Sequence, residues 1–178
     1  EAVWYATGTH PHKRIPVPNY GRVCCTDFTN GIEKVILPEI YRWLPKDLIK
    51  KYDVESRTLS LKNGSTIEFM SYDQDVEKFE SASRHWIWFD EEPSSEIFKA
   101  CQMRLIDTRG DLWLTMTPLK GLSWVYSDVY EQANINKNIE VFVFDSTDNP
   151  YLDKETLEDT IKGLSEAERE ARIGGKFI

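Results

Sequence analysis

The sequence predicts an α/β domain with three layers, in which helices cover both faces of a mostly parallel β-sheet. Short, continuously apolar runs such as Ile87–Phe89 are typical of strands buried on both faces. These runs alternate with segments of helical periodicity, as expected for strands joined by crossover helices. The chain has 178 residues, of which 40% are hydrophobic and 12% aromatic, enough for one domain with a substantial core.

The first part of the chain predicts a helix, a loop, a strand and a long helix. Residues 1–7 form the expected first helix, which ends at Gly8, and the proline-rich residues 8–21 form a loop. Residues 22–26 are β-prone. Residues 29–44 have helical periodicity, with Pro38 as a candidate kink.

Residues 58–71 predict a β-hairpin whose register can be argued. A two-residue loop would pair Leu61 with Thr66. A three-residue loop pairs Leu61 with Ile67 and places the apolar side chains of both strands on one face. We expect the three-residue loop, with Gly64 at positive φ.

The second half of the chain predicts alternating strands and helices. Residues 86–90 predict a buried strand, and Ser94 or Ser95 is expected to cap the helix that follows. The remaining expected elements are strands at 111–116 and 139–144, and helices at 123–132, at 153–164 and after a capping box at Ser165.

Three carboxylates follow the buried strand directly: Asp90, Glu91 and Glu92. Open α/β sheets bind their ligands at the carboxyl ends of their strands. One acid can hold Mg²⁺, directly or through water, and the next can orient a water against a phosphate. The string therefore resembles a Walker B element, although a strand that simply leaves the core into a solvated turn gives a similar pattern.

Two hydroxyls end the next expected strand, where Thr115 and Thr117 precede Pro118. The intervening helix has about the length that a parallel βαβ crossover needs. If the two strands are neighbours, both ends face one crevice, and the hydroxyls can bond a γ-phosphate, an attacking water or Glu91. The alternative is that threonine is merely common at strand ends and proline stops the pairing.

Charge and cysteine content exclude several classes of protein. The net charge is −8, of which −5 falls within residues 71–92, so a generally nucleic-acid-binding surface is not expected, although a local DNA contact stays open. Cys24, Cys25 and Cys101 form neither a disulfide framework nor a zinc pattern, which favours a reducing compartment. No apolar stretch approaches the roughly 20 residues that cross a bilayer.

Taken together, these residues resemble the ATPase domain of the large terminase subunit of tailed bacteriophages. The likeness covers nearly the whole chain in consistent order. The matching segments are Lys78-Phe79, Trp86 to Pro93, Gly110 to Thr115, Thr117 to Gly121 with Trp124, Asn149 to Leu152, and Arg172 to Phe177.

The resemblance implies a RecA-like sheet of the P-loop NTPase class (ASCE type) with a small C-terminal lid. Residues 1–120 would be the RecA-like core without its N-terminal P-loop portion, and residues 121–178 the rest of the ATPase domain and the lid. The implied activity is ATP hydrolysis, with Mg²⁺, coupled to pumping double-stranded DNA into a procapsid. The implied partners are the portal protein, the small terminase subunit and further copies in a ring, in the host cytoplasm and without a membrane.

The resemblance also assigns roles to single residues. Asp90 corresponds to the acid that associates with Mg²⁺, and Glu91 to the base that activates water. Residues 115–118, with Thr115 and Thr117, correspond to a coupling motif that responds to the nucleotide. Arg84 and Arg104 are candidates for charge-stabilising fingers, and the alternative for each is a solvated or ion-paired surface arginine.

No G-x-x-x-x-G-K-[ST] phosphate loop occurs in the sequence. In the family it lies upstream of the segment that corresponds to residues 1–11, so we expect this chain to be a fragment that binds ATP weakly and hydrolyses it negligibly alone. Two other interpretations stay open. One is the ATPase domain of a superfamily 2 helicase, and the other is a non-catalytic scaffold that kept a nucleotide-motor fold.

Overall fold

The structure is a computed structural model that describes residues 1–178. It contains two units that are each compact, residues Glu1–Thr115 and Met116–Ile178. The roles expected for the two parts, a nucleotide-binding core and a lid, remain predictions. No helix is long and apolar enough to cross a membrane.

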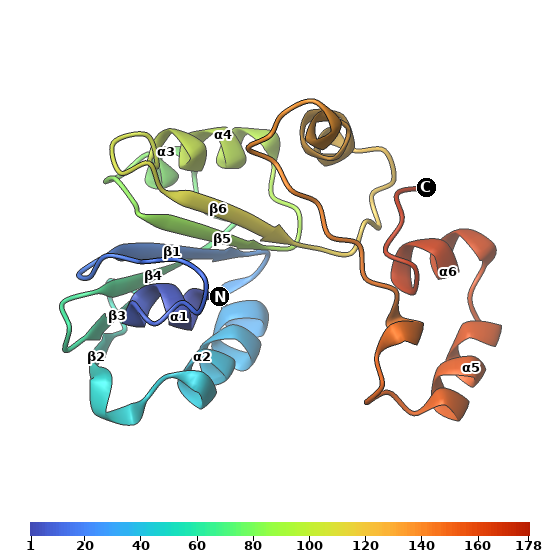
Figure 1. The fold of residues 1–178 in the computed structure, drawn as a ribbon, viewed down its shortest axis with the longest axis horizontal. Coiled ribbons are helices and arrows are strands. Elements are labelled where there is room, and N and C mark those ends of the chain that lie inside the picture. The colour runs from blue at the N-terminus through green and yellow to red at the C-terminus, as the bar shows by residue number, and fades with distance from the viewer. The chain divides into compact units, whose positions relative to one another are not determined.

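The first unit is built on a six-stranded sheet in the order β2-β3-β4-β1-β5-β6 (Figure 1). The strands are β1 (Tyr20–Cys25), β2 (Ile49–Asp53), β3 (Thr58–Leu61), β4 (Thr66–Ser71), β5 (Trp86–Asp90) and β6 (Asp111–Thr115). β1 runs parallel to β4 and β5, and β5 runs parallel to β6, whereas β2 and β3 pair antiparallel at one edge. The expected mostly parallel sheet is confirmed.

Helices cover both faces of this sheet, which confirms the expected three layers (Figure 1). One face carries α1 (Ala2–Thr7), η1 (Phe28–Ile36) and α2 (Leu37–Trp43), and the other carries α3 (Val76–Phe79) and α4 (Ser95–Met103). Each face has its own buried apolar cluster. Val23 and Trp86 belong to the first cluster, whereas Cys24 and Ile87 belong to the second, as the alternation of side chains along a strand requires.

The strand β5 lies inside the sheet and is apolar on both faces, as predicted. Trp86, Ile87 and Phe89 have no solvent-exposed surface. The large Trp86 ring lies directly over Gly21 of β1, where a Cβ atom would come within 1.9 Å of it. Glycine at this position therefore lets the ring pack flat against the neighbouring strand.

The helix expected over residues 29–44 is divided near Pro38. A π-helical segment, η1, begins after Asp27, whose side chain accepts from the Asn30 amide, and it continues into α2 at Leu37. Pro38 lies in the first turn of α2, directly after the junction of the two segments. The proline therefore marks a change of helix type.

The hairpin confirms two expectations and corrects a third. Gly64 has a φ of 89°, as predicted, and the apolar side chains of β3 and β4 share one buried face. The predicted pairing is wrong, because Leu59, not Leu61, lies opposite Ile67. A shift of two residues keeps every side chain on its face, so the hydrophobic pattern alone does not distinguish the two registers.

Contacts from outside the hairpin explain the observed register. The side-chain amide of Asn63 donates to the Ala6 carbonyl of α1 at 2.9 Å, and its Oδ1 accepts from the backbone N–H of Ser65 at 2.9 Å. The Ser65 hydroxyl in turn accepts from the Asn19 amide at 3.0 Å. These bonds attach the turn to α1 and to Asn19 and so hold it in its observed conformation.

The edge strand β2 was not predicted from the sequence. Its residues read Ile-Lys-Lys-Tyr-Asp, without a strong β signal. Lysines on an edge strand discourage pairing with a strand of another molecule. The residues that weaken the β-propensity of this segment are therefore suited to the edge of the sheet.

The second unit is helical and irregular. Its elements are η3 (Tyr126–Tyr130), η4 (Glu131–Asn134), η5 (Ser146–Asp148), α5 (Lys154–Lys162) and α6 (Glu166–Arg172). The helix expected at 123–132 is a π-helical turn followed by a 3₁₀ turn. The capping box between Ser165 and Glu168 is present, as predicted.

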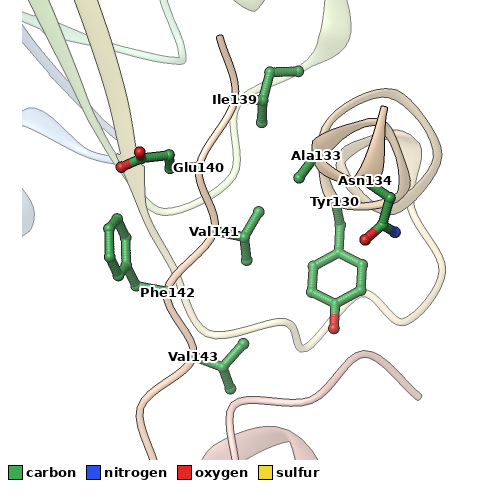
Figure 2. Close-up of a pocket in the computed structure, with 8 residues that line it drawn as sticks. All are labelled: Tyr130, Ala133, Asn134, Ile139, Glu140, Val141, Phe142 and Val143. Atoms are coloured by element: carbon green, nitrogen blue, oxygen red, sulfur yellow. The ribbon is translucent and has the colours of Figure 1, made fainter. Parts of the chain in front are cut away.

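The strand predicted at residues 139–144 is wrong. This run is irregular, and the second unit contains no strand that could pair with its backbone. In Figure 2, Val141 faces the hollow beside Tyr130, whereas Phe142 points away from it. The hollow measures about 460 Å³. The run thus keeps the side-chain alternation of a strand without its hydrogen bonds.

Candidate functional site

The carboxyl ends of the parallel strands form the candidate site. β1 is followed by η1 and α2 on one face of the sheet, whereas β4 and β5 are followed by α3 and α4 on the other (Figure 1). Adjacent strands whose connections leave on opposite faces open a crevice at their carboxyl ends. β5 ends there at Asp90, and its neighbour β6 ends at Thr115.

Asp90 and Thr115 are paired in the ladder between β5 and β6. The Thr115 hydroxyl lies 3.2 Å from Asp90 Oδ1, and the Trp88 indole N–H donates to the same hydroxyl at 2.8 Å. Because the indole donates to this hydroxyl, the hydroxyl keeps its own proton to donate, either to Asp90 Oδ1 or to the Phe89 carbonyl at 3.4 Å. The expectation that the two strand ends adjoin is confirmed for this pair.

A thiol completes the surroundings of the Asp90 carboxylate. Cys25, the last residue of β1, donates its Sγ–H weakly to Asp90 Oδ2 at 3.7 Å. Each carboxylate oxygen therefore contacts a different neighbouring strand, β6 on one side and β1 on the other. The sequence alone does not indicate this position for Cys25, because only the order of strands in the sheet brings β1 beside β5.

Glu91 has an unusual backbone. Its φ is 64°, in the left-handed region that residues other than glycine adopt at a cost of about 1–2 kcal/mol. Its amide donates to the Thr115 carbonyl at 2.7 Å. Arg57, Ala82 and Arg109 also have a positive φ, so this strain alone assigns Glu91 no role. The next residue, Glu92, is only 7% exposed.

Thr117, the second predicted hydroxyl, belongs to the second unit, two residues beyond the end of β6. Its expected role beside the nucleotide stays a prediction.

The structure does not bring Arg84 and Arg104 to this site. The two lie together at the amino end of β5, where the Arg84 amide donates to the Arg104 carbonyl at 2.8 Å. β5 rises roughly 3.3 Å per residue, so its amino end is about 13 Å from Asp90. The Arg104 guanidinium donates to the Glu80 carbonyl at 2.8 Å.

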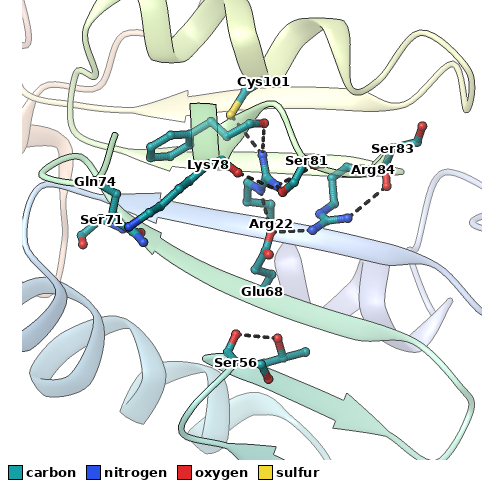
Figure 3. Close-up of polar contacts among 12 residues, drawn as sticks. Arg22, Ser56, Glu68, Ser71, Gln74, Lys78, Ser81, Ser83, Arg84 and Cys101 are labelled. Carbon is teal, nitrogen blue, oxygen red and sulfur yellow. Dashed lines mark hydrogen bonds and ion pairs between the residues drawn. The ribbon is translucent and has the colours of Figure 1, made fainter. Parts of the chain in front are cut away.

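Arg84 belongs to a buried ionic network (Figure 3). Glu68 Oε2 accepts from Arg22 Nε at 2.7 Å and from Arg84 Nη2 at 2.6 Å. Arg22 also donates to the carbonyls of Phe79 and Ser81, and its side chain has no exposed surface. Within this chain Arg84 is therefore an ion-paired arginine, which was the alternative to its role as a charge-stabilising finger.

The donor set at Asp90 suits Mg²⁺ that arrives with a nucleotide. The chain contains no cluster of three or more His, Cys, Asp or Glu side chains that could hold a metal ion. Mg²⁺ is usually held by one or two carboxylates together with phosphates and water, so a single aspartate beside a hydroxyl fits it.

Comparisons with known proteins identify the family of this chain. The family described as "Terminase large subunit, T4likevirus-type, N-terminal" matches residues 1–178. The large terminase subunit of Salmonella phage P22 is 28% identical over 159 residues, which are 89% of this chain and 30% of that protein.

Solved structures of the large terminase from a thermophilic bacteriophage share the fold. One has a TM-score of 0.75 at 17% identity and covers 90% of this chain and 41% of its own. Another, in complex with ADP, has a TM-score of 0.69 at 18% identity and covers 90% of this chain and 40% of its own. This chain therefore spans less than half the length of these relatives. Since the family match extends over every residue, the chain belongs to the terminase large subunits of the T4likevirus type, as their N-terminal part.

Proposed function

We propose that this chain is the ATPase module of a DNA-packaging motor, which couples ATP hydrolysis to the movement of double-stranded DNA into a procapsid. The observation that carries the proposal is the pairing of Asp90 with Thr115 at adjoining strand ends. Family membership supports the same function. The portal protein, the small terminase subunit and a homo-oligomeric ring in the host cytoplasm belong to the proposal as partners and setting.

In this proposal the site residues divide the work of phosphoryl transfer. Asp90 would hold Mg²⁺, directly or through water, and Mg²⁺ bound with ATP would neutralise charge on the phosphates. Glu91 accepts a proton from the attacking water, whose oxygen bonds the γ-phosphorus while the bond to the ADP oxygen breaks. Thr115 and Thr117 respond to the loss of the γ-phosphate and pass that change on.

Phosphate affinity would come largely from residues outside this chain. No phosphate-loop motif occurs within the 178 residues. A nest of backbone N–H groups with its lysine supplies most of the grip on a triphosphate in P-loop enzymes. We therefore infer that this chain alone hydrolyses ATP negligibly, and that the longer polypeptide is the form to assay.

The proposal gives Arg84 and Arg104 no part in hydrolysis at the Asp90 site of their own subunit. They lie at the opposite end of β5, and Arg84 is ion-paired. As fingers they would act only on the nucleotide of a neighbouring subunit in a ring.

The test is ATP hydrolysis by the full-length protein. Glu91→Gln should lower the turnover number by orders of magnitude, because positioning and electrostatics dominate phosphoryl transfer. Glu96→Gln, which makes the same change on an exposed residue of α4, serves as the matched control and should leave turnover unchanged. Near-normal turnover in Glu91→Gln removes Glu91 from the role of base.

Two other results would replace the proposal. Separation of DNA strands by the full-length protein would indicate a helicase, since a packaging motor moves on duplex DNA. A full-length protein that neither binds nor hydrolyses ATP would indicate a scaffold.

A further inference from the structure

The hydroxyl of Tyr72 lies among three backbone carbonyls at the candidate site. Tyr72 follows the last residue of β4, and its Oη is 2.8 Å from the Glu91 carbonyl oxygen, 3.0 Å from that of Asp90 and 3.2 Å from that of Cys24. A phenol carries one proton, and carbonyls can only accept. The one hydroxyl is therefore shared between the end of β1 and the turn after β5, with its shortest contact at Glu91.

The phenol stays a donor at neutral pH. Burial, and next the neighbouring cysteines and Asp90, raise the pKa of Tyr72 well above its ordinary value. Its ring is fixed as well, since it packs against Phe89 with centroids 6.3 Å apart, and its amide donates to the Cys25 carbonyl at 2.9 Å. The Tyr72 hydroxyl is thus held in a fixed position against the backbone carbonyls that it contacts.

The turn that this hydroxyl touches is the strained one. Glu91 has its φ of 64°, and both of its peptide groups are held from outside β5. The amide donates to the Thr115 carbonyl at 2.7 Å, on β6, and the carbonyl accepts from Tyr72. A conformation that is intrinsically unfavourable persists when its surroundings over-determine it, and these two bonds do so here.

We propose that Tyr72 is a positioning residue for ATP hydrolysis, whose hydroxyl holds the turn at Glu91 in the left-handed conformation that orients the Glu91 carboxylate. The φ at Glu91 sets the direction of its side chain relative to that of Asp90. Misplacement of a reacting group by about 1 Å can lower a rate about 10²-fold. This inference rests on the proposed role of Glu91 in hydrolysis.

The first experiment is Tyr72→Phe in the full-length protein, a change that removes the hydroxyl and keeps the ring. We expect kcat for ATP hydrolysis to fall about 10- to 100-fold while KM changes less than about threefold. The reason is that the variant loses the orientation of the Glu91 carboxylate but keeps its contacts with ATP. Tyr52→Phe is the matched control, on the half-buried Tyr52 of β2, and should leave both constants unchanged. A wild-type kcat in Tyr72→Phe, or a loss confined to KM, overturns the inference.

A double-mutant cycle separates this inference from the function on which it rests. If Tyr72 acts through Glu91, Tyr72→Phe causes no further loss in a Glu91→Gln background, measured as residual hydrolysis in long incubations. A further loss of the full 10- to 100-fold contradicts a role through Glu91. If Glu91→Gln alone hydrolyses ATP normally, it is the proposed function that fails.

The second experiment needs no catalysis and uses the 178-residue chain itself. Amide hydrogen exchange measures how readily the bond from the Glu91 amide to the Thr115 carbonyl opens. In Tyr72→Phe we expect exchange at Glu91 to accelerate about tenfold or more, with the amides of Ile87 and Trp88 inside β5 unchanged. Unchanged exchange at Glu91 shows that the hydroxyl does not hold the turn. A uniform rise across β5 shows a general loss of stability and also overturns the inference.

Discussion

Replacing Glu68 by alanine would leave the charge of Arg22 inside the sheet without its carboxylate. Arg22 has a fully buried side chain, and its Nε lies 2.7 Å from Glu68 Oε2. Its other donors bond neutral groups, mainly the carbonyls of Phe79 and Ser81. Those bonds would remain in the variant, but no anion would offset the guanidinium.

The expected loss is about 3–5 kcal/mol, the usual cost of removing one partner from a buried ion pair. Arg84 bonds the same carboxylate oxygen and is only 12% exposed, so this figure, which counts Arg22 alone, is a lower bound. Domains of this kind are stable by about 5–15 kcal/mol in total. Glu68→Ala should therefore remove a large share of the stability of the first unit.

Urea unfolding at pH 7, followed by tryptophan fluorescence and circular dichroism, measures the loss. Glu68→Gln, which keeps one neutral oxygen for Arg22, serves as a milder variant if the alanine protein does not fold. Lys51→Ala is the matched control in the same unit, because the Lys51–Asp53 pair is 61% and 36% exposed, and it should cost less than about 1 kcal/mol. A loss in Glu68→Ala no larger than that of the control would refute the reasoning.

The same network predicts the pH dependence of this loss. Burial alone would raise the pKa of Glu68, but the charges of Arg22 and Arg84 outweigh it and hold the pKa below its ordinary value. A carboxylate with a lowered folded pKa stabilises above its unfolded pKa of about 4.3, and the effect disappears as pH falls through the folded pKa. The stability difference between the native chain and Glu68→Ala should thus be constant near neutrality and narrow below about pH 4.3. If the difference in unfolding free energy instead increases as the pH falls, the lowered pKa of Glu68 is contradicted.

Three further substitutions, together with Ser95→Ala as a control, test the packing of the first unit by thermal or urea unfolding. Gly64→Ala should destabilise by about 1–2 kcal/mol, since φ is 89° there, and an unchanged midpoint would show that the turn relaxes freely. Ser94→Ala should cost about 1 kcal/mol because its hydroxyl caps α4, whereas Ser95→Ala one residue later should cost little, and equal effects would argue against the cap. Gly21→Ala should destabilise by about 1–3 kcal/mol or more, because its Cβ would lie 1.9 Å from the Trp86 ring, and native-like fluorescence with native stability would contradict that contact.

Local patterns predicted those parts of the site that depend on neighbours in the chain. The apolar run from Trp86 to Phe89 followed by acids, and the β-prone run that ends at Thr115, each signal a strand with a polar end. The crossover helix between them has the length that parallel pairing requires, and the ladder does pair Asp90 with Thr115.

Contacts between distant segments could not be predicted in this way. Cys25 and Tyr72 reach the site only because of where β1 and β4 lie in the sheet relative to β5, an order that no local pattern encodes. The hairpin register follows from Asn63 bonding α1. The sequence left each arginine as either a finger or a solvated or ion-paired surface residue, and the position of Arg84 beside Glu68 identifies it as ion-paired within this chain.

The irregular run at residues 139–144 has a practical consequence for anyone who purifies this chain. Phe142 and Phe144 are 72% and 80% exposed, and Glu140 is the only charge among six residues that favour extended structure. Short, hydrophobic, proline-free segments of this kind cause identical molecules to aggregate at high concentration. Preparations should therefore be kept dilute, and a lysine introduced in place of Phe142 should delay turbidity during storage.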